Sequence, residues 1–150
     1  MITEQGIIDK TIQRFLIDEE DAGWSVIDAS CVYWNRDTGA VCGAGNLLSK
    51  ATLKALKAGD QTASIGNLLA RLQVIGRVDD VAMLKKHMTL ISKIQRDHDS
   101  SATGSLRQVE AGLDEEVHQE DFRERFWYDI RSLIEEYQLD DSLLPSLEVA

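Results

Sequence analysis

Residues 121–137 read DFRERFWYDIRSLIEEY, and this stretch indicates the fold class. Its apolar side chains recur at intervals of three and four positions, which predicts an amphipathic helix with one buried face. The residues of this apolar stripe are Phe122, Phe126, Ile130, Leu133, Ile134 and Tyr137. Pro145 is expected to lie in a tail after the helix, since proline cannot continue it.

The same spacing predicts further helices upstream. They cover residues 3–19, 49–58, 62–75, and 79 or 80 to about 97. Gly59 and Gly76 follow the second and third of these helices, as expected for residues that end a helix. Asp79 or Asp80 is expected to cap the fourth helix, because a short acidic side chain accepts hydrogen bonds from the first free amides.

Residues 30–43, SCVYWNRDTGAVCG, predict a β-hairpin because two β-favouring runs flank a turn-forming stretch. A four-residue loop over 36–39 would pair Tyr33 opposite Cys42 and place Cys31 on the same face. With a five-residue loop, Cys31 and Cys42 would face opposite sides and no bridge could form between them. The register stays open, and we expect both thiols to be reduced.

Residues 97–105, DHDSSATGS, are small and polar and predict a loop. Residues 106–117 are weakly periodic and are expected to be helical. The fold class is therefore mainly α, with five or six helices packed with one short β-hairpin near residues 30–43. The expected organisation is a single domain over 1–150, with an acidic C-terminal helical segment over 105–139 and a tail over 140–150.

Charge is distributed unevenly along the chain. The net charge is −10, yet residues 1–96 carry 12 Lys and Arg against 11 Asp and Glu, whereas residues 97–150 carry 4 against 15. Such an acidic surface repels phosphates, so we expect no direct contact with nucleic acid. No apolar run is long enough to span a bilayer, and the start lacks the pattern of a signal peptide. We therefore expect no membrane contact and a cytoplasmic location.

Three short motifs were candidates for chemistry. Residues 43–46, GAGN, begin like a phosphate-binding loop but lack its third glycine, so a tight turn is the better interpretation. Residues 115–118, EEVH, contain one Glu-x-x-His pair, whereas a carboxylate-bridged metal centre needs two such pairs, and the sequence has no second one. His98 lies between two aspartates and could be an oriented base, although no nucleophile elbow adjoins it. We expect no cofactor and no metal, with a small hydrolase or metal-dependent enzyme centred on His98, Asp99 and the two cysteines as the alternative.

The acidic C-terminal segment is the strongest candidate for a binding surface. Carboxylates at regular helical spacing can compete with phosphates for a basic surface, although they also serve simple solubility. Phe126, Trp127 and Tyr128 follow one another and cannot all face the same side of a helix, so we expect one of them to contact a partner or a neighbouring helix. The candidate partner-binding residues are Glu110, Asp114, Glu115, Glu116, Glu120, Glu124, Trp127, Tyr128, Glu135 and Glu136.

Two motifs and the end of the last predicted helix carry a family resemblance. Residues 31–47 contain Cys-x-Tyr followed by Gly-x-x-Cys-x-x-Gly-x-Leu, and residues 95–99 contain Gln-x-x-His-Asp. Both resemble elements of an uncharacterised family of small proteins from tailed bacteriophages and prophages, and residues 134–139 resemble the closing helix of that family. Gly43 stands where the family has alanine. The resemblance implies a small phage-encoded accessory protein and implies no reaction.

The sequence therefore favours a non-enzymatic binding protein of phage or prophage origin, acting in the cytoplasm of the host bacterium. Its acidic C-terminal helices would engage a basic surface on a host protein, and an anti-defence inhibitor is the concrete form of this hypothesis. A further alternative is a homo-oligomeric structural or assembly component, such as a homodimer, for which we expect Trp127 and Tyr128 to be exposed on the last helix.

Overall fold

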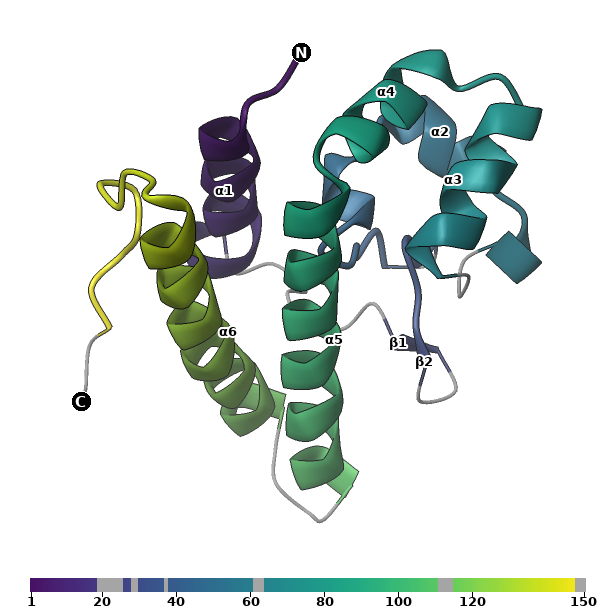
Figure 1. The fold of residues 1–150 in the computed structure, drawn as a ribbon. Helices are drawn as coiled ribbons and strands as arrows, with labels where there is room; N and C mark the ends of the chain where they lie inside the picture. The colour runs from purple at the N-terminus through teal and green to yellow at the C-terminus, as the bar shows by residue number, and fades with distance from the viewer. Residues whose placement is uncertain (19–25, 28–29, 37, 61–63, 111–114, 148–150) are drawn as a thin grey trace.

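The computed structural model describes residues 1–18, 26–27, 30–36, 38–60, 64–110 and 115–147. Helices dominate this part of the chain (Figure 1), which confirms the mainly α prediction. The α-helices are α1 Glu4–Ile12, α2 Lys50–Ala55, α3 Ile65–Val74, α4 Val78–Lys86, α5 Met88–Glu110 and α6 Glu115–Tyr137. The shorter helices are the π-helix η1 Gln13–Ile17, directly after α1, and the 3₁₀ turns η2 Gly45–Leu47 and η3 Ala58–Asp60.

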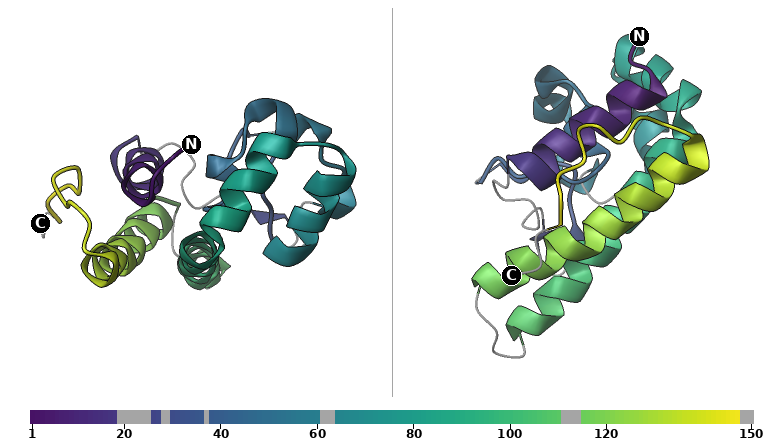
Figure 2. Two further views of the ribbon diagram at one scale, coloured as in Figure 1. Left: turned by 45° about the horizontal axis from the view of Figure 1, so that its top comes forward. Right: turned by 90° about the vertical axis from the view of Figure 1, so that its left-hand side faces the viewer.

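The central element of the fold is α5. It lies beside α6, and the two helices run in opposite directions (Figure 1). Figure 2 shows the group formed by α2, α3 and α4 on the other side of α5 from α6, while α1 packs close to α6. The faces of α5 are therefore covered from two directions.

The first helix agrees with its sequence pattern. Thr3 caps α1 by accepting a hydrogen bond from the Gly6 amide at 3.0 Å. The chain stays helical through η1, where Phe15 and Leu16 are buried in the core. The break predicted after residue 19 lies outside the described residues.

The β-hairpin predicted near residues 30–43 is not formed as a pair of strands. The described strands, β1 Val26–Ile27 and β2 Ser30–Cys31, have two residues each and pair with one another in antiparallel orientation. A single bridge joins Trp34 to Val41, which agrees with the register of a four-residue loop. The ladder extends no further in the described residues, because the chain turns into η2 shortly after Val41. The Cys31 side chain lies outside the described residues, so its placement relative to Cys42 stays a prediction.

The loop predicted for residues 97–105 is wrong, because α5 continues through this stretch to Glu110. Small polar residues are weak helix formers when they are considered alone. Here His98, Ser101 and Ala102 are buried, so packing in the core outweighs the local preference. The single helix predicted to reach about residue 97 is divided into α4 and α5 by His87, whose Nε2 lies 2.9 Å from the Ile2 carbonyl oxygen.

The start of α4 differs from the sequence prediction. Arg77 occupies the cap position without a capping hydrogen bond from its side chain, and Asp79 and Asp80 lie inside the first turn. Acidic residues there are favoured by the positive end of the helix dipole. The Asp80 carboxylate accepts hydrogen bonds from the hydroxyls of Ser49 and Thr52, and it thereby joins α4 to the start of α2.

The last helix, α6, begins at Glu115, earlier than the predicted start at Asp121, and ends at Tyr137. Its predicted apolar stripe is confirmed: Phe122, Phe126 and Ile130 are fully buried. The chain then folds back as a tail that contains Pro145, as predicted (Figure 1). No helix in the described part of the chain combines the length and the apolar character that crossing a bilayer requires.

Candidate functional site

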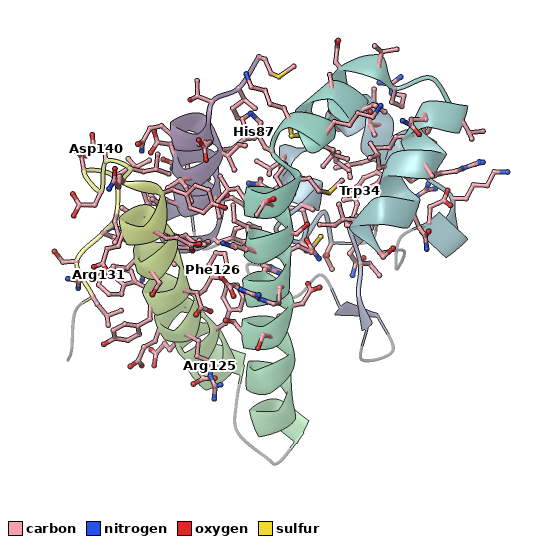
Figure 3. All side chains as sticks on the ribbon, viewed as in Figure 1. Trp34, His87, Arg125, Phe126, Arg131 and Asp140 are labelled. Carbon is pink, nitrogen blue, oxygen red and sulfur yellow. The ribbon has the colours of Figure 1, made fainter. Side chains whose placement is uncertain are left out.

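His98, the candidate base, lies in an aromatic cage in the core. Its imidazole is fully buried, and its ring centroid lies 4.8 Å from that of Phe15, 5.3 Å from that of Phe122 and 5.8 Å from that of Phe126. These rings come from η1 and α6, and Phe126 lies between α6 and α5 in Figure 3. The cage thus holds three separate elements together through one imidazole.

A polar network continues from His98 towards the turn before η2. The Asp99 Oδ1 atom lies 3.5 Å from His98 Nδ1, and Gln95 Nε2 donates to both Asp99 oxygens at 2.9 and 3.0 Å. Gln95 Oε1 in turn accepts a hydrogen bond from the Ala44 amide at 2.7 Å. This chain of bonds fixes the turn to α5 and satisfies polar groups that would otherwise be costly to bury.

Cys42 adjoins the same network. It is a free, fully buried thiol whose sulfur accepts a hydrogen bond from the Gly45 amide at 3.4 Å. Burial, opposed only in part by this hydrogen bond, raises the pKa of the Cys42 thiol to about 12. Burial also raises the pKa of the neighbouring Tyr33 hydroxyl. Since the thiolate is the nucleophile, Cys42 is unreactive at neutral pH.

The structure therefore brings together His98, Asp99 and Cys42, which belong to the enzymatic alternative. Their surroundings are those of a packed core and not those of an open active site. The imidazole and the thiol are closed off from solvent, and the protonated form of the thiol is favoured. A general base needs hydrogen-bond reach to a substrate, which a fully buried ring among phenylalanines does not have. The geometry consequently supports a role in packing for these groups.

A cavity of about 430 Å³ lies elsewhere, at the start of α2 and α4. Its lining includes Ser49, Ala51 and residues 76–80. Beside it, Arg77 Nε donates to the Thr52 hydroxyl at 2.8 Å, and this hydroxyl also bonds to the Asp80 carboxylate. The sequence does not predict this cluster, because its residues come from two segments that share no motif.

Two carboxylates lie close to the contact between α5 and α6. Burial raises the pKa of the Asp97 carboxyl, and burial together with repulsion from Asp97 raises that of Asp129. Arg96 Nε, 3.6 Å from Asp97 Oδ1, and the Ser101 hydroxyl, 3.5 Å from Asp129 Oδ2, oppose these shifts only in part. The sequence did not predict that Asp97 and Asp129 lie close together, because residues 97–105 were predicted to form a loop.

The structure describes only some of the candidate partner-binding carboxylates. The side chains of Glu110, Asp114, Glu115 and Glu116 lie outside the described residues. Those of Glu120, Glu124, Glu135 and Glu136 are exposed on α6. Glu136 pairs with Lys93, and Glu135 Oε1 lies 3.5 Å from Arg131 Nε.

The two candidate aromatic residues have different environments. Tyr128 is 54% exposed, as predicted. The expectation that Trp127 is also exposed is wrong: only 8% of it is accessible. Its indole Nε1 donates to the Pro145 carbonyl oxygen at 2.7 Å, and the Arg131 guanidinium lies 5.5 Å from its ring centroid. The tail after α6 therefore covers Trp127, and no pattern in the sequence predicts that contact.

No family model, curated protein or solved structure matches this chain. Among the described residues, no group of three or more His, Cys, Asp and Glu side chains is arranged to hold a metal ion.

Proposed function

We propose that this chain is a non-enzymatic binding protein that docks the outer face of α6 onto a basic surface of another protein. The supporting observation is an exposed tyrosine among exposed carboxylates on one side of that helix. We define the acidic stripe as Glu120, Glu124, Tyr128 and Glu135. The spacings of four, four and seven residues place these side chains along one face over about 22 Å.

The charges of the acidic stripe are available to a partner. In the described part of the chain, Glu120 and Glu124 form no ion pair. Glu135 has the nearby Arg131, but both side chains are more than half exposed, and such surface pairs contribute little. Tyr128 adds a rigid aromatic surface of the kind that is enriched at protein interfaces.

A partner for this surface needs lysine or arginine side chains whose alkyl stems can cover Tyr128. Surfaces that bind nucleic acid have this character, because carboxylates on a helix offer charges in place of phosphates. The resemblance to tailed-phage proteins favours a host protein, and an inhibitor of host defence or of nucleic-acid processing is the concrete form of the proposal.

The test is affinity capture from host lysate after nuclease treatment, with washes at low and high salt. The test variant replaces Glu120, Glu124 and Glu135 with lysine. The control variant makes the same change at Glu4, Asp18 and Asp79, which are exposed and lie outside α6. We expect a basic protein that the wild type and the control capture at low salt and that the test variant loses. Equal capture by the test variant would refute the proposal.

Tyr128→Ala separates the aromatic contribution from the charges. Loss of the ring should weaken binding of the captured protein at high salt as well as at low salt, because apolar contact is not screened by ions. An unchanged affinity would leave the carboxylates as the sole basis of recognition and would refute the part assigned to Tyr128.

A further inference from the structure

The tail after α6 meets the rest of the molecule at two well-defined points. Gln5 on α1 forms a reciprocal pair with the backbone of Asp140: its Nε2 donates to the carbonyl at 3.0 Å, and its Oε1 accepts from the amide at 2.7 Å. Further along, Pro145 accepts the indole hydrogen bond of Trp127. Three leucines of the tail pack against the core, namely Leu139, Leu144 and Leu147.

The turn between α6 and the tail is strained. The Leu139 amide bonds to the Ile134 carbonyl at 2.9 Å, and the Gln138 amide bonds to the Glu135 carbonyl at 3.3 Å, which is the Schellman pattern of a helix end. This pattern requires a left-handed residue, usually glycine. Gln138 occupies that position with φ +53°, and it is the one non-glycine residue with positive φ in the described part of the chain.

We propose that the tail exchanges between two copies of this chain, so that the tail of each copy occupies the site beside α1 and α6 of the other. A continuation of α6 through Gln138 would remove the left-handed conformation, and strained hinges of this kind favour exchange. The contacts of Asp140, Leu144, Pro145 and Leu147 are the same whichever copy supplies the tail. Only the hinge changes between the closed monomer and the exchanged dimer.

Variants of the hinge residue Gln138 test the exchange in the full chain. Sedimentation equilibrium over micromolar to millimolar concentrations should show a dimer of the wild type. Gln138→Gly relieves the strain of the closed turn, and because two closed turns replace each exchanged dimer, it should raise the dimer dissociation constant by about thirtyfold or more. Gln138→Ala keeps the β-carbon, and with it the strain, so it should leave the constant close to that of the wild type.

Trp127→Phe provides the second discriminating variant. It removes the hydrogen bond to Pro145 equally from the monomer and from the dimer, so the chain should be less stable while the dimer dissociation constant is unchanged. A dimer that this variant weakens would be an ordinary interface at Trp127 and would overturn the proposal. A wild type that stays monomeric throughout, or a constant that Gln138→Gly leaves unchanged, would also overturn it.

The exchange is independent of the proposed function of the acidic stripe. Because the tail contacts are apolar or hydrogen-bonded, high salt should leave the dimer intact, whereas it should release a basic partner. The two proposals can therefore fail separately.

Discussion

Replacement of Gly45 by alanine should strongly destabilise the protein. A β-carbon at Gly45 would lie 2.0 Å from the Tyr33 carbonyl oxygen and 2.8 Å from its carbonyl carbon. Real β-carbons essentially never come closer than 3.0 Å to such atoms, so the two backbone segments must separate by about 1 Å. The obstacle is backbone, which cannot rotate away as a flexible side chain can.

The size of the effect follows from what this separation disturbs. The segment around Gly45 includes the buried residues Cys42, Ala44 and Leu47, and it is held to α5 by the bond from Ala44 to Gln95. Overpacking costs about 1–3 kcal/mol, and loss of a hydrogen bond adds about 1 kcal/mol, so we expect a loss of about 3 kcal/mol in the free energy of unfolding.

Gly66→Ala is the matched control. Gly66 lies within α3, and a β-carbon there would have nothing within 4 Å. This change should stabilise the protein by about 0.5–1 kcal/mol, because alanine restricts the unfolded chain and favours the helix. Urea unfolding followed by circular dichroism measures both variants. A Gly45→Ala variant within about 0.5 kcal/mol of the wild type would refute the close approach of Gly45 to Tyr33.

Two further predictions concern titratable groups. Asp129→Asn should raise the free energy of unfolding at neutral pH, because burial and Asp97 raise the pKa of the Asp129 carboxyl and its charged form therefore disfavours folding. Below the ordinary pKa of 3.8 the carboxyl is protonated in both states, so the difference between variant and wild type should vanish. Urea unfolding at several pH values measures this, and a variant less stable than the wild type at neutral pH would contradict it. In a Cys31→Ser background, iodoacetamide should label Cys42 no faster than the protein unfolds, because its thiol is buried with a pKa of about 12; rapid labelling of the native protein, read by mass spectrometry, would count against the buried site.

The helices were predictable wherever their signals are local. The stripe from Phe122 to Tyr137 indicated the buried face of α6, because a helix brings residues three and four apart to the same side. The exposure of Glu124, Glu135 and Tyr128 follows from the same periodicity, since these residues lie opposite that face. The candidate binding surface was therefore within reach of sequence reasoning.

The environment of the candidate chemical groups was not predictable in this way. His98 is enclosed by Phe15 and Phe122, which are remote from it in the sequence, and Trp127 is covered by a tail that returns to it. Periodicity shows that a side chain faces inward, but it does not identify the side chains from other elements that meet it. Burial, which governs the reactivity of Cys42, depends on those contacts.

The amino-acid order alone accounts for the helical class, the first and last helices and the concentration of acid near the C-terminus, because these depend on neighbours within a turn or two. The helix through residues 97–105, the reduction of the predicted hairpin to a single bridge between Trp34 and Val41, and the covered Trp127 depend on distant parts of the chain. Helix propensities differ by well under about 1 kcal/mol for most residues, whereas burial of one large apolar side chain contributes about 1.5–3 kcal/mol, so packing prevails wherever the two conflict.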